Sequence, residues 1–558
     1  MKRNKKAYVI GVICALGITT MLLGSCKRND SDQKELSQNQ NRQENLQQSE
    51  QASQIEPPLL QGQSSQAEPP LPPELSSQPP KESGQTDTRE LLLLDTSDMF
   101  SNRDREAVYD EKKSVSILLE KDKINCASKS VQVEGSKAII TEEGTYILSG
   151  SLENGSIVID AEDTDKIQLV LKDVTMNCNH SAAIYVKQAD KVFVTLDKDS
   201  ENTLTVAGEF EELDDNHIDG VIFSKADLTL NGNGSLKIDT PYGHGIVSKD
   251  DLVIIGGNYE LNVGEQGISG KDSVRIAGGN FVITAREDGI YSENTEDITK
   301  GFVYIAGGNY ELAATDDAIH AGAQLVVEGG NVHISECEEG LEGMSVDIQG
   351  GNIVLNSKDD GVNASVPDEL EEAAEALEKK GCFIRIGGGN LQIVAGGDGI
   401  DANGSIYMTG GETYICAPVS NDNGGIDYDE EGIISGGVLV TAGYQGMTQG
   451  FGKGSTQNVI TARLTQLQKS NTQVELKDTE GNVLVSMQPK VDYDFVMISC
   501  PELKVGSTYT LLTGTQSQKL QVSEQGLGGF MPFDMPGGPQ GERPEDIIQK
   551  SDPKANNW

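Results

Sequence analysis

The feature that most constrains the fold of this chain is a repeated Gly-Gly-Asn triplet. Six copies recur at steps of 22, 29, 22, 21 and 38 residues, beginning at Gly256, Gly278, Gly307, Gly329, Gly350 and Gly388. Degenerate copies begin at Gly410 and Gly436. Self-similarity at a period of about 20–50 residues indicates a stacked repeat architecture. We therefore expect the fold to be built from similar coils rather than from a single irregular core.

Each repeat unit has the pattern of short β-strands. Apolar residues alternate with polar ones before the triplet, as at Val274 and Ile276, and after it, as at Phe281 and Ile283. This period of two predicts strands with one buried face. Short strands joined at glycine corners predict an all-β, right-handed parallel β-helix whose coils stack ~4.8 Å apart. We expect it to extend from about residue 130 to 455, with the triplets stacked at one corner.

The N-terminal residues have the features of a secretory segment. A basic start is followed by an apolar run over residues 8–23 and by Leu-Gly-Ser before Cys26. Residues 1–26 resemble a bacterial lipoprotein signal peptide, which implies lipidation of Cys26. Residues 27–90 are rich in Gln, Ser, Glu and Pro, and this composition predicts a disordered linker. The expected location is therefore extracytoplasmic, at the bacterial cell surface, with a lipid anchor in the membrane.

The remaining chain divides into three expected regions. Residues 91–455 are expected to form the β-helix, with its first coils over residues 91–180 and a short helix inserted at 367–380. Residues 456–525 have ordinary strand and turn signals and predict a small C-terminal β region. Residues 526–558 are rich in Gly and Pro and are expected to be disordered.

The charge of the chain limits its partners. Eighty-seven acids against 44 bases give a net charge of −43, which makes nucleic acid and anionic lipid surfaces poor partners. Such a chain can hold cations, or can hold an anionic ligand through cations. We expect a monomer.

Acidic residues recur at one position of successive coils and predict a metal site. In a β-helix, equivalent positions become stacked neighbours, and two carboxylates ~5 Å apart repel by about 0.8 kcal/mol even in water. Oxygen ligands without His or Cys favour Ca²⁺. The alternative is that these acids point outward and stay hydrated. The candidate ligands are Glu339, Glu342, Asp359, Asp360, Asn363, Asp398, Asp401 and Asp427.

Two further columns of residues recur along the coils. The triplet asparagines are expected to be structural, because stacked Asn amides can hydrogen-bond along the axis. A second column, expected to face outward, alternates Arg and Tyr and supplies carbohydrate-binding candidates, because Arg suits carboxylates and an aromatic ring suits a sugar face. A solvated strand face explains this column equally well. Its candidates are Arg275, Tyr304, Arg385 and Tyr407.

Two enzyme classes share parts of these patterns. Gly243-His244-Gly245 and the Asp pairs at 316–317 and 359–360 resemble polygalacturonase motifs, but their order is reversed and no Arg-x-Lys follows. A lyase needs a base beside its calcium, and only Lys358 and Arg385 lie near in sequence. We therefore predict no catalytic residue, and a polysaccharide lyase or hydrolase remains the alternative.

Two stretches carry a family resemblance: residues 398–411, which begin Asp-Gly-Ile-Asp, and residues 424–437, which begin Gly-Gly-Ile-Asp. They resemble the carbohydrate-binding β-helix surface lipoproteins of Gram-positive bacteria, over roughly residues 90–525 and in the tail. The resemblance implies a pectate-lyase-like fold, calcium binding, and binding of acidic plant-type polysaccharide such as polygalacturonate without cleavage. This chain departs from the family pattern at two positions: Glu412 replaces the triplet Asn, and Gly424 replaces the acid of the repeated position. An envelope spacer or adhesin is a further alternative.

Overall fold

The computed structural model describes residues 91–211, 217–366 and 381–522. The expected signal peptide, Cys26, the linker, the inserted helix and the tail lie outside these residues. Every regular element of the described chain is a strand, from β1 to β41. No helix of the described residues is long and apolar enough to cross a membrane.

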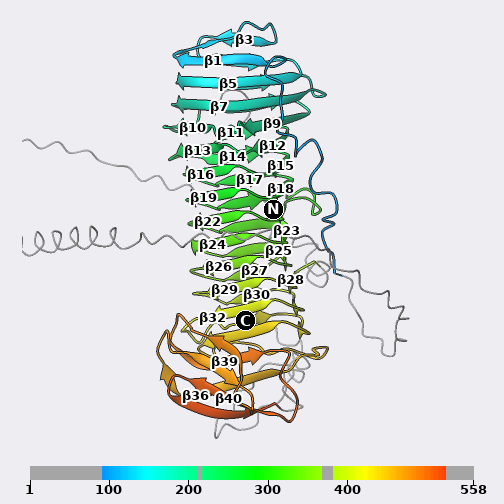
Figure 1. Cartoon of the computed structure of the whole chain (residues 1–558), viewed down its shortest axis with the longest axis vertical. Coiled ribbons are helices and arrows are strands. Elements are labelled where there is room, and N and C mark those ends of the chain that lie inside the picture. Colours follow the sequence, from blue (N-terminus) through cyan, green and yellow to red (C-terminus); the bar gives the residue numbers. More distant parts are fainter. Residues whose placement is uncertain (1–90, 212–216, 367–380, 523–558) are drawn as a thin grey trace, which may run out of the picture. The chain divides into compact units, whose positions relative to one another are not determined.

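Most strands stack in parallel on three faces of a β-helix, which confirms the predicted fold class (Figure 1). The asparagine face consists of β10 (Glu201–Val206), β13 (Ser235–Thr240), β16 (Asn258–Val263), β19 (Asn280–Ala285), β22 (Asn309–Ala313), β24 (Asn331–Glu336), β26 (Asn352–Asn356), β29 (Asn390–Val394), β32 (Glu412–Cys416) and β35 (Val438–Gly443). The acid face consists of β4 (Lys137–Ile140), β6 (Ser156–Asp160), β8 (Ile184–Gln188), β11 (Gly220–Ser224), β14 (His244–Ser248), β17 (Ile268–Gly270), β20 (Ile290–Ser292), β27 (Val362–Ala364), β30 (Ile400–Ala402) and β33 (Asp427–Tyr428). We call the third face the strap face because residues 91–114 run along it (Figure 1). It consists of β9 (Lys191–Leu196), β12 (Asp227–Gly232), β15 (Asp251–Ile254), β18 (Ser273–Ile276), β21 (Phe302–Ile305), β28 (Phe383–Ile386), β31 (Ser405–Met408) and β34 (Gly432–Ile434).

Longer strands bend around corners and join the faces. β5 (Gly144–Glu153) and β7 (Lys166–Cys178) continue from the strap face onto the asparagine face, and β1 (Val115–Lys121) pairs along β5. β23 (Ile319–Val327) and β25 (Leu341–Ile348) continue from the acid face onto the strap face. At the N-terminal end, β2 (Lys123–Asn125) and β3 (Val131–Glu134) pair antiparallel with β1 and β4 and close the stack.

The Gly-Gly-Asn triplets stack at one corner, as the sequence predicts. Asn258, Asn280, Asn309, Asn331, Asn352 and Asn390 are register partners on successive coils, and we call them the asparagine column. Asn280 donates its side-chain amide to Asn258 at 2.8 Å, and Asn309 and Asn331 each repeat this bond to the preceding coil at 2.8 Å. The second glycine of each triplet has a positive φ, such as 131° at Gly279, which an L side chain rarely adopts. The structural interpretation of this column is therefore confirmed.

Stacked apolar side chains fill the interior of the coils. Strands of the asparagine face such as β16 and β19 alternate exposed and buried residues. Tyr259, Phe281 and Tyr310 stack inside the helix with ring centroids 5.1 and 4.8 Å apart. Such aromatic pairs contribute about 0.5–1.5 kcal/mol each beyond their buried area. The period-two pattern therefore places the core where the sequence predicts it.

The segment over residues 91–114, which we call the strap, runs along the strap face instead of forming a coil (Figure 1). The Leu92 carbonyl accepts a bond from Gln324 at 2.7 Å, and Asp104 accepts one from Thr229 at 2.7 Å. Between these contacts Met99 packs on Tyr304 in an apolar cluster. The expectation that coils begin at residue 91 is wrong, because this segment uses its apolar side chains to cover an existing face.

At the C-terminal end, antiparallel strands extend the large sheet of the β-helix. β39 (Tyr493–Ser499) pairs antiparallel with β35 and with β36 (Val459–Gln468). A separate antiparallel sheet has the order β38 (Val483–Met487), β37 (Val474–Lys477), β40 (Thr508–Thr513) and β41 (Gln516–Gln521). Its apolar residues share a core with the outer side of β32 and β35. The C-terminal sheet therefore covers the outer side of β32 and β35, the last strands of the asparagine face.

Candidate functional site

The acid face carries a ladder of side chains that accept backbone hydrogen bonds from the next coil. Asp288 accepts the N–H of Asp317 at 3.1 Å, Asp317 accepts that of Glu339 at 3.2 Å, and Asp360 accepts that of Asp398 at 2.5 Å. Asp398 in turn accepts the N–H of Gly424. One oxygen of each of these carboxylates therefore stabilises the stack of coils, a structural role that the sequence did not reveal.

His244 has the same structural role at an earlier coil. Its Nδ1 accepts the backbone N–H of Gln266 at 3.1 Å, so its proton lies on Nε2, which is 2.9 Å from Glu265. The side chain of Gln266 then donates to Asp288 at 3.1 Å. The Gly-His-Gly resemblance to polygalacturonases is thus explained by coil stacking.

A second column on the acid face contains a histidine whose role the sequence analysis missed. His320 is the register partner of Glu342, and its Nδ1 lies 3.2 Å from Asp317 and closer still to Glu342. Burial lowers the pKa of His320, but the two carboxylates outweigh this effect and raise it to about 10. Glu342, a predicted calcium ligand, is therefore neutralised by a protein cation. Aligning His320 with Glu342 in the sequence repeat could have revealed this pair.

Two other predicted ligands satisfy each other. Asn363 donates its side-chain amide to Glu339 at 2.8 Å. Burial and the neighbouring Glu342 raise the pKa of Glu339 to about 8, which means that its charged form is disfavoured. These two residues lie along the chain between His320 and the acidic residues at 398–427, and their side chains bond to each other.

Three of the predicted ligands come together on the last acidic coils. Asp398, Asp401 and Asp427 each present a carboxylate oxygen within 4.8 Å of the others. Asn363, Asp401 and Asp427 are successive register partners, so coil stacking creates this cluster. Burial and the neighbouring carboxylates raise the pKa of Asp398 and of Asp401 to about 7, and burial raises that of Asp427. Close oxygen ligands with uncompensated charge suit Ca²⁺. We call these three residues the carboxylate cluster.

The predicted ligands Asp359 and Asp360 border this cluster. Burial raises the pKa of Asp360 to about 6, although the N–H of Asp398 opposes the shift. One oxygen of each of these two carboxylates lies against Gly397, at the place where a Cβ would project. A glycine at position 397 is thus required for the two carboxylates to approach the cluster.

The four carbohydrate-binding candidates lie on the strap face and are engaged by protein groups. Tyr304 is only 4% exposed beneath the strap, so the expectation that it faces outward is wrong. Its hydroxyl donates to Glu328 at 2.6 Å, and that of Tyr407 donates to Glu431 at 3.0 Å. Arg275 pairs with Asp251 at 2.6 Å, and Arg385 forms a two-pronged contact with Asp347. Arg385 and Tyr407 lie beyond the coils that the strap contacts, and their binding role stays a prediction.

Comparisons with known proteins place this architecture in a family. The profile of the carbohydrate-binding domain-containing protein family matches residues 134–372 and 324–448. A carbohydrate-binding domain-containing protein of Acetivibrio thermocellus is 43% identical over 189 residues, which are 33% of this chain and 66% of that relative.

A solved structure is described as the polysaccharide lyase-like protein from C. thermocellum, as a gadolinium derivative. It is 34% identical, covers 43% of this chain and 96% of its own, and has a TM-score of 0.39. Because the profile matches together extend over more than half of the 558 residues, the chain belongs to the carbohydrate-binding domain-containing family.

Proposed function

We propose that this protein is a calcium-dependent, non-catalytic receptor for acidic polysaccharide such as polygalacturonate, held at the bacterial cell surface by a lipid on Cys26. The observation that carries the proposal is the carboxylate cluster in a protein of a carbohydrate-binding family. The chain has a net charge of −43 and would repel a uronate polymer. A cation coordinated by both partners removes that repulsion.

The cluster fits this role better than the rest of the ladder. At the coil of His320, an imidazolium already balances the acids, whereas in the carboxylate cluster the neighbouring carboxylates, including Asp360, raise the pKa of Asp398 and of Asp401 further. Ca²⁺ takes 6–8 oxygen ligands in flexible geometry, so three carboxylates leave positions for oxygens of a ligand. The expected affinity for Ca²⁺ is on the order of 10⁻⁴–10⁻³ M, as in extracellular modules.

The bases that a lyase would need are engaged elsewhere. Lys358 pairs with Glu336 at 3.0 Å, and Arg385 is held by Asp347. Neither therefore stands ready to abstract a proton from a substrate. An assay for unsaturated or reducing-end products on polygalacturonate should remain at background.

Retention of the protein on immobilised polygalacturonate tests the proposal. With 5 mM Ca²⁺ the wild type should be retained, a chelator should release it, and 0.5 M NaCl should release much less, because direct coordination is screened less than surface charge. The variant Asp398→Asn plus Asp401→Asn should lose retention and calcium uptake. Release by salt but not by chelator would contradict calcium bridging.

A matched control removes two charges elsewhere. Asp163 and Asp199 are exposed acids of the first coils, far along the chain from the carboxylate cluster. Asp163→Asn plus Asp199→Asn should therefore leave calcium uptake and retention unchanged. If both double variants lose retention equally, net charge rather than coordination governs binding.

A further inference from the structure

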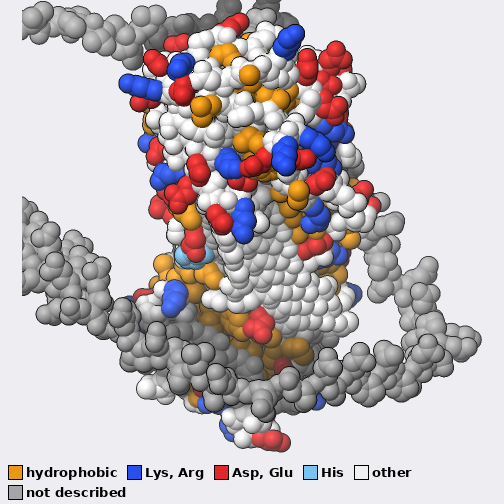
Figure 2. Space-filling model, turned by 45° about the horizontal axis from the view of Figure 1, so that its top comes forward, with side chains coloured by type: hydrophobic (Ala, Val, Ile, Leu, Met, Phe, Trp, Pro, Cys, Tyr) orange, Lys and Arg blue, Asp and Glu red, His pale blue; other side chains and the backbone are white. Residues whose placement is uncertain are grey.

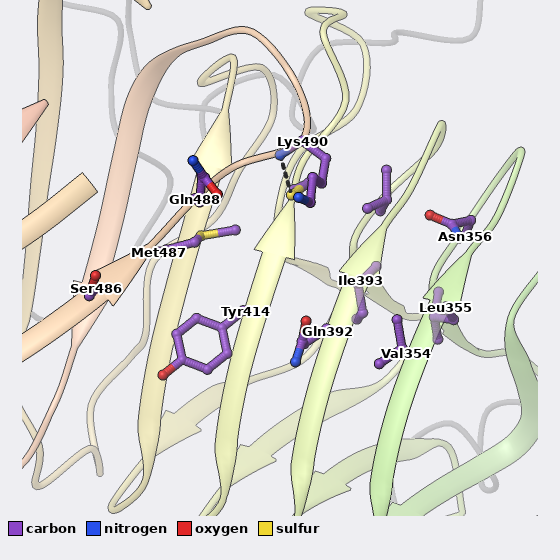
Figure 3. Close-up of a pocket in the computed structure, with 12 residues that line it drawn as sticks. Val354, Leu355, Asn356, Gln392, Ile393, Tyr414, Ser486, Met487, Gln488 and Lys490 are labelled. Atoms are coloured by element: carbon purple, nitrogen blue, oxygen red, sulfur yellow. Dashed lines mark hydrogen bonds between the residues drawn. The ribbon is translucent and has the colours of Figure 1, made fainter. Parts of the chain in front are cut away.

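A cleft of about 480 Å³ lies where the asparagine face meets the C-terminal region (Figure 3). One wall is a row of outward side chains on adjacent strands: Val354 on β26, Gln392 on β29 and Tyr414 on β32, which are successive register partners. The other wall is the segment that follows β38, with Gln488 and Lys490. Three rungs of a parallel sheet extend ~10 Å, and the volume suits a small ligand segment.

The charge of this cleft is opposite to that of the protein as a whole. Lys490 is its one charged lining residue, and none of the twelve lining residues is acidic. Over the whole chain, by contrast, acids outnumber bases by 87 to 44. Figure 2 shows both signs interspersed toward the end formed by the first coils, a surface unlike this cleft. An anionic ligand would therefore meet no lining carboxylate here.

Several polar groups of the cleft have no partner among the residues that the structure describes. In the described part of the chain, no side-chain hydrogen bond or ion pair engages the amides of Gln392 and Asn356 or the ammonium of Lys490. The amide nitrogen of Gln488 donates to the Asn471 carbonyl at 3.1 Å, which leaves its side-chain oxygen as an acceptor. The cleft thus offers amide donors and acceptors together with one cation.

The walls are fixed before any ligand binds. The backbone N–H of Lys490 donates to Cys416 Sγ at 3.2 Å, which holds the segment after β38 against β32. The Tyr414 hydroxyl donates to Glu412 at 3.1 Å, and its ring is half-buried at the edge of the C-terminal core. Pre-organised walls reduce the entropy lost on binding.

We propose that this cleft binds a uronic-acid unit of the polysaccharide, with the sugar ring on Tyr414, hydroxyls on Gln392 and Gln488, and the carboxylate on Lys490. The inference rests on the proposed function and adds a second contact for the same polymer. Val394, at the end of β29, lies four residues before Asp398, so their Cα atoms are at most ~14 Å apart. One polymer strand can therefore pass from the carboxylate cluster around the corner to the cleft.

Calorimetry of the full chain with short oligogalacturonates in 5 mM Ca²⁺ tests this inference. Lys490→Gln and Gln392→Ala should each weaken binding by about fivefold, the effect of a partly exposed polar contact worth about 1 kcal/mol. Tyr414→Ala should weaken it further, while Tyr414→Phe should retain most of it. Lys504→Gln removes the same charge from an exposed lysine outside the cleft and should have no effect.

A direct measurement avoids dependence on variant folding. Acetylation of Lys490 in the wild type, followed by mass spectrometry, should slow when oligogalacturonate is present, and acetylation of Lys504 should not. If binding is normal but Lys490 is unprotected and its variant unaffected, the cleft inference is overturned and the calcium-bridged function stands. If the wild type binds no polygalacturonate, both are overturned. Equal binding of a neutral cello-oligosaccharide, independent of Lys490, would overturn the uronate assignment.

Discussion

Single residues decide which coils of the acid face carry uncompensated charge. The register that joins Glu342, Asn363, Asp401 and Asp427 also includes His320, one coil earlier. Its ring stacks on Tyr291 at 5.1 Å and is held between two carboxylates. An internal cation thus stabilises the middle of the ladder, whereas Asn363, Asp401 and Asp427 occupy the same register on the following coils.

Replacing this cation should destabilise the protein. We expect His320→Gln to lower the free energy of unfolding by about 2 kcal/mol, because removing one partner of a buried ion pair costs about 3–5 kcal/mol and this ring retains some solvent contact. Urea denaturation at pH 6 measures the change. His333→Gln is the matched control, since His333 pairs with Glu311 at 2.5 Å on an exposed surface and should change stability by less than about 0.5 kcal/mol. Equal losses would contradict the role given to His320.

The same residue predicts a pH dependence. The pKa of His320 rises from 6.5 to about 10 on folding, so the native state holds the proton more tightly than the unfolded chain. Its stabilisation is complete below about pH 6.5 and is lost as the pH rises toward 10. The stability difference between wild type and His320→Gln should therefore shrink across this window. A difference that stays constant from pH 6 to pH 10 would show that the imidazolium charge is not involved.

Gly397 controls the approach of Asp359 and Asp360 to the carboxylate cluster. We expect Gly397→Ala to displace both carboxylates and to weaken calcium binding about tenfold, with a stability loss of about 1–3 kcal/mol from overpacking. Calorimetric calcium titration measures the first effect. Gly450→Ala is the control, because a Cβ there would have no atom within 4 Å and should change neither quantity.

At the scale of elements, the asparagine column ends with an incomplete rung. Asn390 donates to Asn352 at 2.9 Å, but its own Oδ1 is buried and accepts no hydrogen bond from the residues that the structure describes. Its neighbour on the next coil is Glu412, whose side chain lacks the amide donor of an asparagine and accepts from Tyr414 instead. The column therefore stops where the repeated asparagine is replaced.

Extending the column by one residue should stabilise the fold. We expect Glu412→Asn to raise the free energy of unfolding by about 1 kcal/mol, the usual net value of a satisfied hydrogen bond. Glu412→Ala removes the same charge and the same acceptor for Tyr414 without adding a donor, so it should not stabilise. Thermal unfolding of the two variants separates them, and equal shifts would mean that charge relief, rather than the hydrogen bond, is responsible.

At the scale of the whole molecule, the acid face makes stability depend on pH. Asp398 and Asp401 have pKa values raised to about 7, above the 3.8 of an unfolded aspartate. The calcium-free native state then binds protons more tightly than the unfolded chain, and its stability should fall as the pH rises from about 4 to about 7.

On the proposed function, calcium should reverse this trend, because the ion would bind the deprotonated carboxylates. With 10 mM Ca²⁺ and an affinity of 10⁻⁴–10⁻³ M, the free energy of unfolding at pH 7.5 should rise by about 1.4–2.7 kcal/mol. The increment should be smaller at pH 5 and absent in Asp398→Asn plus Asp401→Asn. Urea titrations with calcium and with chelator measure it, and an increment that the double variant retains would place the ion elsewhere.

The repeat allows the architecture to be predicted from the sequence. The residues that each acidic side chain contacts could not be predicted in this way. The triplets at Gly278, Gly329 and Gly350 stack as their spacing requires, because each is a local turn signal that recurs in phase. Of the eight predicted ligands, Asp398, Asp401 and Asp427 form one cluster. Glu342 instead pairs with His320, and Asn363 instead bonds to Glu339. Long-range packing selects one partner for each side chain among several nearby groups.

The sequence by itself determined the coil: alternating apolar residues choose strands, glycines with positive φ choose corners, and the constant phase chooses stacking. These are local preferences, and they act wherever the residues occur in the chain. Only the tertiary structure decided that the strap covers Tyr304, that His320 neutralises part of the ladder, and that the C-terminal region encloses a cleft with Lys490. Burial and electrostatic energy depend on which distant residues come within a few ångströms, and linear spacing does not specify those distances.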